Sequence, residues 1–306
     1  MRGKYLNPKA DLTFKLVFGE HPDLVMSLLN ALLPLPDDGQ IESVEYLQQD
    51  MVPDNPAKKD SIVDVRCKDQ RGRQFIVEMQ LYWNDAFKRR VLLNASKAVV
   101  RQLDAGEEYS LIEPVYCLSL VNDKAFDNDT DEFYHDYAIV DVEHTDRHIE
   151  GLRFVFVELP KFKPQTILEK KMAVLWLRFL TEVSEQSDEV PAELLENAET
   201  SKALGIIERS AMNEAQLYAY EQFWDAVTNE RVLINGGYKK GHEEGLAEGR
   251  AEGLAEGEAI GIAKERERSK ARQLETARCL KTAGLAVSLI SQATGLSVEE
   301  IDRLNI

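Results

Sequence analysis

The sequence predicts an α/β protein in which helices flank a mixed sheet. Three observations support this fold class. A helical pattern, three strand-like runs, a second helix and a further strand follow one another over about 160 residues. A glycine-containing turn joins two of the β-branched runs into a hairpin. From about residue 165 the pattern becomes wholly helical, which indicates a helical region, a glycine-repeat segment and a small helical tail.

The predicted core begins with a helix over residues 11–33. Its apolar residues recur at helical spacing, Asp11 can cap its first turn, and a break is expected near Pro22. Pro34 ends the helix, and residues 41–47 can form a first strand.

The next two strands are predicted over residues 60–67 and 74–82. If the connecting turn has three residues with Gly72 in the left-handed conformation, Asp69 faces Arg73 across the hairpin. This turn fixes the register of both strands, because strand pairing continues from the turn outwards.

That register places Asp64 opposite Glu78, with Cβ atoms about 5 Å apart. Gln80 lies two residues on and faces the same way as Glu78. Opposed carboxylates destabilise a sheet, whereas a divalent cation between them reverses the sign of the interaction. The alternative is a solvated hairpin face with scattered charge, which a one-residue slip in register would produce.

The remaining elements of the core are a helix and three strands, predicted over residues 84–104, 115–121, 134–142 and 152–159. Asn84 or Asp85 can cap the helix. We therefore assign residues 1–160 to the core and 161–235 to a helical region packed on it. Helices are expected there over residues 167–180, 191–209 and 211–233.

A glycine repeat occupies residues 236–270. Glycine recurs at every fourth position from Gly237 to Gly261, and each interior glycine costs a helix about 1 kcal/mol relative to alanine. The segment is therefore either a flexible spacer or a helix that self-associates by close backbone approach, and we favour the second, which makes a homo-oligomer.

Residues 271–306 predict a small helix-turn-helix-like tail. Ser297 and Glu300 match a capping box at the start of its second helix. The tail can be a DNA-reading pair or an assembly module. Assembly is favoured because the second helix is acidic.

Charge and cysteine content restrict the function. The net charge is −17, which argues against a general nucleic-acid binder. Cations nevertheless gather in one predicted helix, where a solvated helix face is the alternative explanation: Lys88, Arg89, Arg90, Lys97 and Arg101. The three cysteines and five histidines lack metal-ligand spacing. With no apolar run near the roughly 20 residues of a membrane span, a cytoplasmic protein is expected.

Several segments together resemble the recombination-promoting nuclease (transposase-like) family of bacteria, part of the PD-(D/E)XK nuclease superfamily. The resemblance covers roughly residues 5–235 and depends on the order and spacing of these segments: Asp11–Gly19, Ile62–Val65, Val77–Gln80, Arg89-Arg90 with Ser96-Lys97, and Gln102–Tyr109 leading into Pro114-Val115.

The resemblance implies an αβββαβ nuclease core. Asp64 and Glu78 match the two acidic positions of the superfamily motif, and Gln80 stands where lysine is usual. Val63 replaces the proline of the motif, and Asp11 matches an acidic residue of the first helix. Glutamine cannot act as a cation or a useful base, so its implied role is to orient water or substrate.

The implied activity is that of a Mg²⁺-dependent DNA endonuclease, with Mn²⁺ as a possible substitute, acting in recombination or on mobile elements. Asp64, Glu78 and Asp11 are the implied metal ligands. Arg90, Lys97 and Arg101 share a helical face and are the implied DNA contacts. An inactive nuclease fold that binds DNA and self-assembles, and a purely structural oligomer, are the alternatives.

Overall fold

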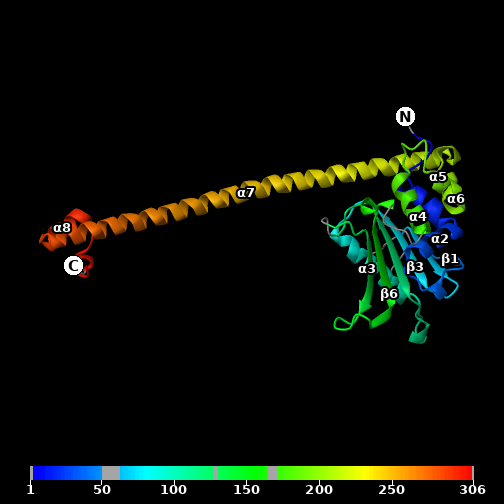
Figure 1. Cartoon of the computed structure of the whole chain (residues 1–306), viewed down its shortest axis with the longest axis horizontal. Helices are drawn as coiled ribbons and strands as arrows, with labels where there is room; N and C mark the ends of the chain where they lie inside the picture. Colours follow the sequence, from blue (N-terminus) through cyan, green and yellow to red (C-terminus); the bar gives the residue numbers. More distant parts are fainter. Residues whose placement is uncertain (1–2, 50–62, 127–129, 165–170, 305–306) are drawn as a thin grey trace. The chain divides into compact units, whose positions relative to one another are not determined.

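The computed structural model describes residues 3–49, 63–126, 130–164 and 171–304 (Figure 1). The chain divides into two compact units, Met1–Val227 and Thr228–Ile306. The first unit contains the sheet and the second the C-terminal tail. The first residues of the predicted 60–67 strand and of the predicted 167–180 helix lie outside the described residues.

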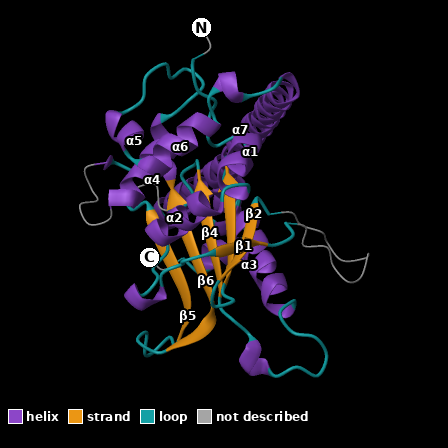
Figure 2. Cartoon of the chain, turned by 90° about the vertical axis from the view of Figure 1, so that its right-hand side faces the viewer, coloured by secondary structure: helices purple, strands orange, loops and turns teal. Residues whose placement is uncertain are grey.

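The first unit is built on a six-stranded mixed sheet with the order β1-β2-β3-β4-β6-β5 (Figure 2). The strands are β1 (Val44–Tyr46), β2 (Val65–Asp69), β3 (Gln74–Gln80), β4 (Val115–Val121), β5 (Tyr134–Val140) and β6 (His148–Glu158). Strands β3, β4 and β6 run parallel, and the other neighbours pair antiparallel. Together with its helices, this sheet confirms the α/β fold class.

The β2–β3 hairpin has the predicted register. Val65 pairs with Val77, and beyond the ladder the Asp69 N–H donates to the Arg73 carbonyl at 3.0 Å. Gly72 has φ +88°, a left-handed conformation that favours glycine. The hairpin is therefore fixed from its turn, as its sequence indicates.

The N-terminal helical segment differs in detail from its prediction. It consists of α1 (Asp11–Phe14), a π-helical turn (Lys15–Gly19) and α2 (Pro22–Leu32), which confirms the break near Pro22. Asp11 does not cap it, since Ala10 is the N-cap residue, and the Asp11 carboxylate pairs with Lys15 at 2.8 Å instead.

Two other predicted elements are shorter than expected. Strand β1 starts late because the backbone of Ile41 is held by both ends of the Asn30 amide, at 2.8 and 2.9 Å. Helix α3 (Asp85–Val100) has Asn84 at its N-cap, without a side-chain capping bond. It ends before residue 104, where the Gln102 side chain instead binds the backbone of Glu113.

The last two strands also depart from prediction at their hairpin. Strand β6 begins four residues early, at His148, because the β5–β6 pairing continues through an irregularity at Ala138/Ile139. Strand β5 ends at Val140, where the Asp141 carboxylate accepts turn N–H groups from Glu143 and His144.

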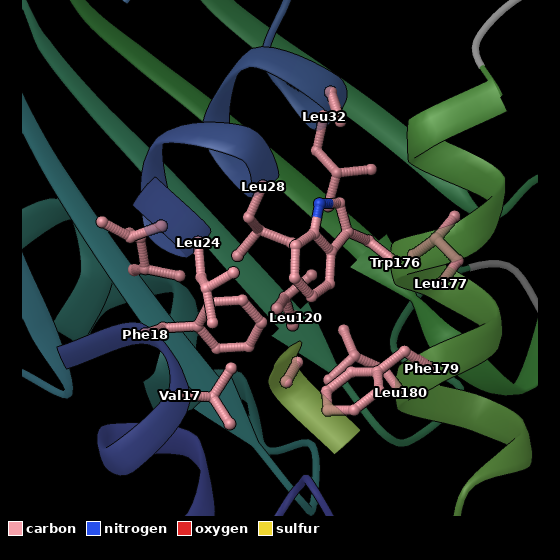
Figure 3. Close-up of a cluster of buried hydrophobic side chains, with 14 of the residues drawn as sticks. Val17, Phe18, Leu24, Leu28, Leu32, Leu120, Trp176, Leu177, Phe179 and Leu180 are labelled. Atoms are coloured by element: carbon pink, nitrogen blue, oxygen red, sulfur yellow. The ribbon is translucent and has the colours of Figure 1, made fainter. Parts of the chain in front are cut away.

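Different helices cover the two faces of the sheet. Helices α1, α2 and α4 (Lys171–Glu182) bury the larger core on one face, where the rings of Phe18 and Trp176 lie 5.3 Å apart (Figure 3). Helix α3 packs on the other face (Figure 1), with Phe87, Val91, Ala95 and Ala98 against Ile76, Val115, Cys117 and Phe156. Side chains of β3 therefore point alternately to α2 and to α3.

The predicted 191–209 helix is two helices, α5 (Ala192–Glu196) and α6 (Ala198–Ile206). Asn197 separates them, because its side chain accepts the N–H groups of Glu199 and Thr200 as an N-cap.

Helix α7 (Glu214–Thr282) begins three residues after the start of the predicted 211–233 helix, because residues 209–211 form a 3-10 turn, and it continues through the glycine repeat. No described atom outside the local helix lies within 4 Å of a Cβ built at any glycine from Gly237 to Gly261. Spacer and self-association therefore both stay predictions.

The tail of the second unit forms a small core of its own. Helices α8 (Val287–Thr294) and α9 (Val298–Asp302) bury Ile290 and Ile301 against Ala277 of α7. Ser297 and Glu300 form the predicted capping box. Among the described helices, none is long and apolar enough to cross a membrane.

Candidate active site

Asp64 and Glu78 lie at the same end of the β2–β3 hairpin. Glu78 is in β3 and points to the α3 face, on the side of Ile76. Asp64 immediately precedes β2, and its Oδ2 accepts the Met79 N–H at 2.6 Å. The Asp64 carboxylate therefore accepts a backbone N–H of β3 just beyond the last β2–β3 pair, and this hydrogen bond keeps Asp64 next to β3.

Both carboxyls are destabilised in their charged forms. Burial raises the pKa of Asp64 to about 6, against the hydrogen bond from Met79, and the charges of Glu78 and Asp11 add to the rise. Burial likewise raises the pKa of Glu78, against hydrogen bonds from Asn94 and Arg90. Two adjoining acids whose pKa values are both raised are typical of a functional site or a metal site, and here the charge of Glu78 contributes to the raised pKa of Asp64.

Helix α3 supplies two groups that hold the Glu78 carboxylate. Asn94 Nδ2 donates to Oε1 at 2.8 Å, and Arg90 Nη2 lies 3.4 Å from Oε2. Arg90 and Asn94 are four residues apart, so they share a helical face. Asn94 is fully buried, and its Oδ1 has no hydrogen-bond partner in the described part of the chain.

Asn94 was not among the predicted site residues. A polar residue on the buried side of the 84–104 helix was the available signal, because a buried amide needs a partner. The sequence did not show that the partner would be Glu78, which lies on a separate strand.

Gln80 links Arg90 to the hairpin. Its Oε1 accepts from Arg90 Nη2 at 2.7 Å, and its Nε2 donates to the Tyr82 carbonyl at 2.6 Å. The guanidinium of Arg90 also lies over the Phe87 ring, 4.8 Å from its centroid. The position that lacks a lysine is therefore occupied by an amide that holds an arginine from α3.

The other predicted site residues lie at different distances from these acids. Asp11 acts on Asp64 through its charge, but its carboxylate is paired with Lys15. Lys97 is in the last turn of α3 and Arg101 is its C-cap, and both interact with other groups of the chain. The structure brings Asp64, Glu78, Gln80 and Arg90 together.

The donor set fits a hard divalent cation. Carboxylate oxygens are the ligands preferred by Mg²⁺ and Mn²⁺, and a cation between Asp64 and Glu78 would lower the pKa of both. In residues 3–49, 63–126, 130–164 and 171–304, no three His, Cys, Asp or Glu side chains form a metal-binding group. A cation here would therefore depend on two carboxylates, with water or substrate completing its coordination.

Comparison with known proteins agrees with this geometry. No curated protein and no solved structure matches the chain significantly. A family model described as PD-(D/E)XK nuclease family transposase matches residues 8–236, which include the whole sheet, α3 and both acids. The chain is a member of this PD-(D/E)XK nuclease family.

Proposed function

We propose that the protein is a divalent-metal-dependent DNA endonuclease that hydrolyses phosphodiester bonds in the bacterial cytoplasm, in recombination or on mobile elements. One observation carries the proposal. In a chain of a nuclease family, two buried acids with raised pKa lie at one hairpin end, beside a cation from α3.

Asp64 and Glu78 are the proposed ligands of Mg²⁺ or Mn²⁺, and Asp11, which is paired with Lys15, would act on the ion only through its charge. When bound, such an ion lowers the pKa of a water molecule and neutralises charge on the scissile phosphate. Asn94 fixes the Glu78 carboxylate, and the Met79 N–H fixes that of Asp64. These contacts preorganise the acids on rigid elements.

Arg90 is the proposed cation for the phosphate that is cleaved. About half of its side chain is exposed, at 47%, so the guanidinium can contact substrate while Gln80 orients it. Gln80 Oε1 has a second lone pair, which can accept a hydrogen bond from the attacking water. Lys97 and Arg101 extend the proposed DNA contacts towards the C-terminal end of α3.

The test is cleavage of supercoiled plasmid by the full chain with Mg²⁺, Mn²⁺, Ca²⁺ or chelator. We expect cleavage with Mg²⁺ or Mn²⁺, none with chelator, and loss of cleavage in Asp64→Ala. Glu45→Gln is the control, because Glu45 is an exposed acid of β1 paired with Lys68. No cleavage by the unmodified protein in any ion, together with no magnesium or manganese uptake by calorimetry, would remove the proposal.

A catalytically inactive fold that binds DNA and self-assembles is the second candidate. The neutral Gln80 at the lysine position and the open glycine stripe of α7 favour it. It predicts metal-independent DNA binding without cleavage. It also predicts that a chain ending at residue 235 forms an oligomer of fewer copies than the full chain, as measured by sedimentation.

A further inference from the structure

A pocket of about 240 Å³ opens beside α3, on the sheet face that carries Glu78. Its walls are Lys88 and Leu92 of α3, Tyr137 of β5, and Phe154 and Phe156 of β6. Apart from the Lys88 amine and the Tyr137 hydroxyl, these side chains present carbon atoms. The pocket is separate from the carboxylates described above.

The strand register places this pocket in line with the candidate active site. Glu78 pairs with Ser119 of β4, and Ser119 pairs with Phe156 of β6. Residues in one such row point to the same face, and neighbouring strands are about 4.8 Å apart. Phe156 is therefore about 10 Å from Glu78 by strand spacing, and the small, buried Ser119 lies between them.

Helix α3 borders both sites. Arg90 and Asn94 contact Glu78, whereas Lys88 and Leu92 line the pocket. Each pair is spaced by four residues and so follows its own helical face. A DNA strand that crosses α3 can therefore contact the two acids and the pocket one after the other.

Tyr137 is the exposed ring of the pocket and is held in place, whereas Phe156 beneath it is buried in the core. Tyr137 is 45% exposed and Leu92 50%, which is unusual for large apolar groups gathered at one place. The Tyr137 ring stacks on Phe126, with centroids 6.1 Å apart and an interplanar angle of 26°, and meets Phe156 edge to face. Lys88 Nζ lies over Phe126, 4.2 Å from the ring centroid.

We propose that this pocket binds one unpaired base of a DNA strand, stacked against Tyr137. Exposed aromatic rings beside a cation are the recognition elements used for single-stranded nucleic acid, because every base has a π-face and every nucleotide a phosphate. Lys88 would pair with that phosphate. A base inside a duplex cannot enter such a pocket.

This inference rests on the proposed nuclease function and specifies its substrate class. The preferred substrate is single-stranded or locally unpaired DNA, with the scissile phosphate a short stretch of strand away from the bound base. An apolar side chain of a protein partner, or a second copy of this chain, is the competing occupant, and the sedimentation and salt-dependence measurements below distinguish these from a base.

The test measures fluorescence anisotropy of a labelled oligonucleotide with the full chain in chelator, so that no cleavage is needed. We expect at least tenfold tighter binding to the single strand than to its duplex. Tyr137→Leu should weaken single-strand binding about tenfold, as loss of one stacked base does. It should leave duplex binding unchanged. Tyr137→Phe, which keeps the ring, is the matched control.

Salt dependence separates stacking from charge. Tyr137→Leu should keep the slope of log affinity against log salt concentration, whereas Lys88→Met should reduce that slope by about 0.7, the value for one phosphate contact on a single strand. A single strand that contains a series of abasic positions should bind Tyr137→Leu and the unmodified chain equally.

Three results would overturn the inference. They are equal affinity for single strand and duplex, unchanged single-strand binding by Tyr137→Leu, and a change of sedimentation in Tyr137→Leu that marks the pocket as a contact between copies. Metal-dependent plasmid cleavage that persists beside any of these would leave the nuclease proposal in place. The two proposals therefore fail separately.

Discussion

Two buried glutamates on the same face of the sheet have opposite electrostatic settings. Glu78 has a raised pKa, because burial outweighs the donors that reach it. Glu158, at the end of β6, is fully buried too. Burial alone would raise its pKa, but hydrogen bonds from Lys161, His135 and the backbone of Ala125 and Phe126 hold it below the usual value.

The difference separates an acid whose charge is compensated inside the fold from the acid that we propose as a metal ligand. Glu158 and Lys161 form a buried ion pair at 2.8 Å, and His135 Nε2 is also 2.8 Å from the same carboxylate oxygen. Glu78 has a neutral amide and a half-exposed arginine at 3.4 Å. Its charge is incompletely compensated, so a cation would stabilise Glu78 and would add little at Glu158.

The largest expected effect is on cleavage. Glu78→Gln should lower the rate by about a thousandfold or more, because it removes a metal ligand charge, whereas Gln80→Ala should lower it about tenfold by releasing Arg90. Single-turnover plasmid cleavage with Mg²⁺ measures both. Comparable residual rates in the two variants would contradict the roles assigned to them.

The next effect is on stability and concerns the other glutamate. Glu158→Ala should lower the free energy of unfolding by about 3 kcal/mol, because it removes the carboxylate that forms a buried ion pair with Lys161. Urea unfolding followed by tryptophan fluorescence measures this. Adding Lys161→Met should restore part of the loss, and Glu78→Gln should remain as stable as the unmodified chain. Similar losses of unfolding free energy in Glu158→Ala and Glu78→Gln would contradict the different roles assigned to the two glutamates.

The pKa of Asp64 is raised whereas that of Glu158 is lowered, so ionisation of Asp64 should change stability in the opposite direction. Between its ordinary pKa of 3.8 and about 6, the native state holds a proton that the unfolded state has released, so stability falls as pH rises through this window. In chelator at pH 7.5, Asp64→Asn should be more stable than the unmodified chain by about 1–2 kcal/mol, allowing for partial solvent screening.

Magnesium should reverse that order, because it stabilises only the chain with the carboxylate. Thermal unfolding across pH 4–8, with and without Mg²⁺, gives the measurement. An Asp64→Asn variant less stable than the unmodified chain at every pH, without metal, would show that the carboxylate is structural.

The smallest effect per residue is expected for the cations. Arg90→Ala, Lys97→Ala and Arg101→Ala together should reduce the slope of log DNA affinity against log salt concentration by about 2–3, since each phosphate contact contributes about 0.7–0.9. Lys202→Ala is the control, because Lys202 pairs with Asp23 of α2, which packs on the other sheet face. An unchanged slope in the triple variant would place the DNA path elsewhere.

The sequence predicted those elements whose ends are set by residues next to them in the chain. Strand β4 begins and ends as expected, because Pro114 and an apolar run define it. The hairpin register followed from Gly72. Asp11 was expected as a cap, but Lys15 competes for its carboxylate, and the choice between them depends on the chain before the helix.

The polar networks could not be predicted, because their members come from distant segments. Periodicity grouped Arg90 with Lys97 and Arg101, but its contacts are Glu78 and Gln80. Glu158 gathers donors from a loop, a strand and a 3-10 turn, and no spacing in the sequence marks them. The glycine repeat carries residues that disfavour a helix, yet the repeat lies within the single helix α7.

The short turn at Gly72 has a consequence for comparing this protein with its relatives. The turn helps to set the pairing of β2 with β3, and a one-residue slip of that pairing would turn Glu78 towards α2 while the sequence kept both acids. The number of residues between the two acids is therefore worth comparing among relatives beside the presence of the acids, because the pairing of the two strands decides whether both carboxyls reach one site.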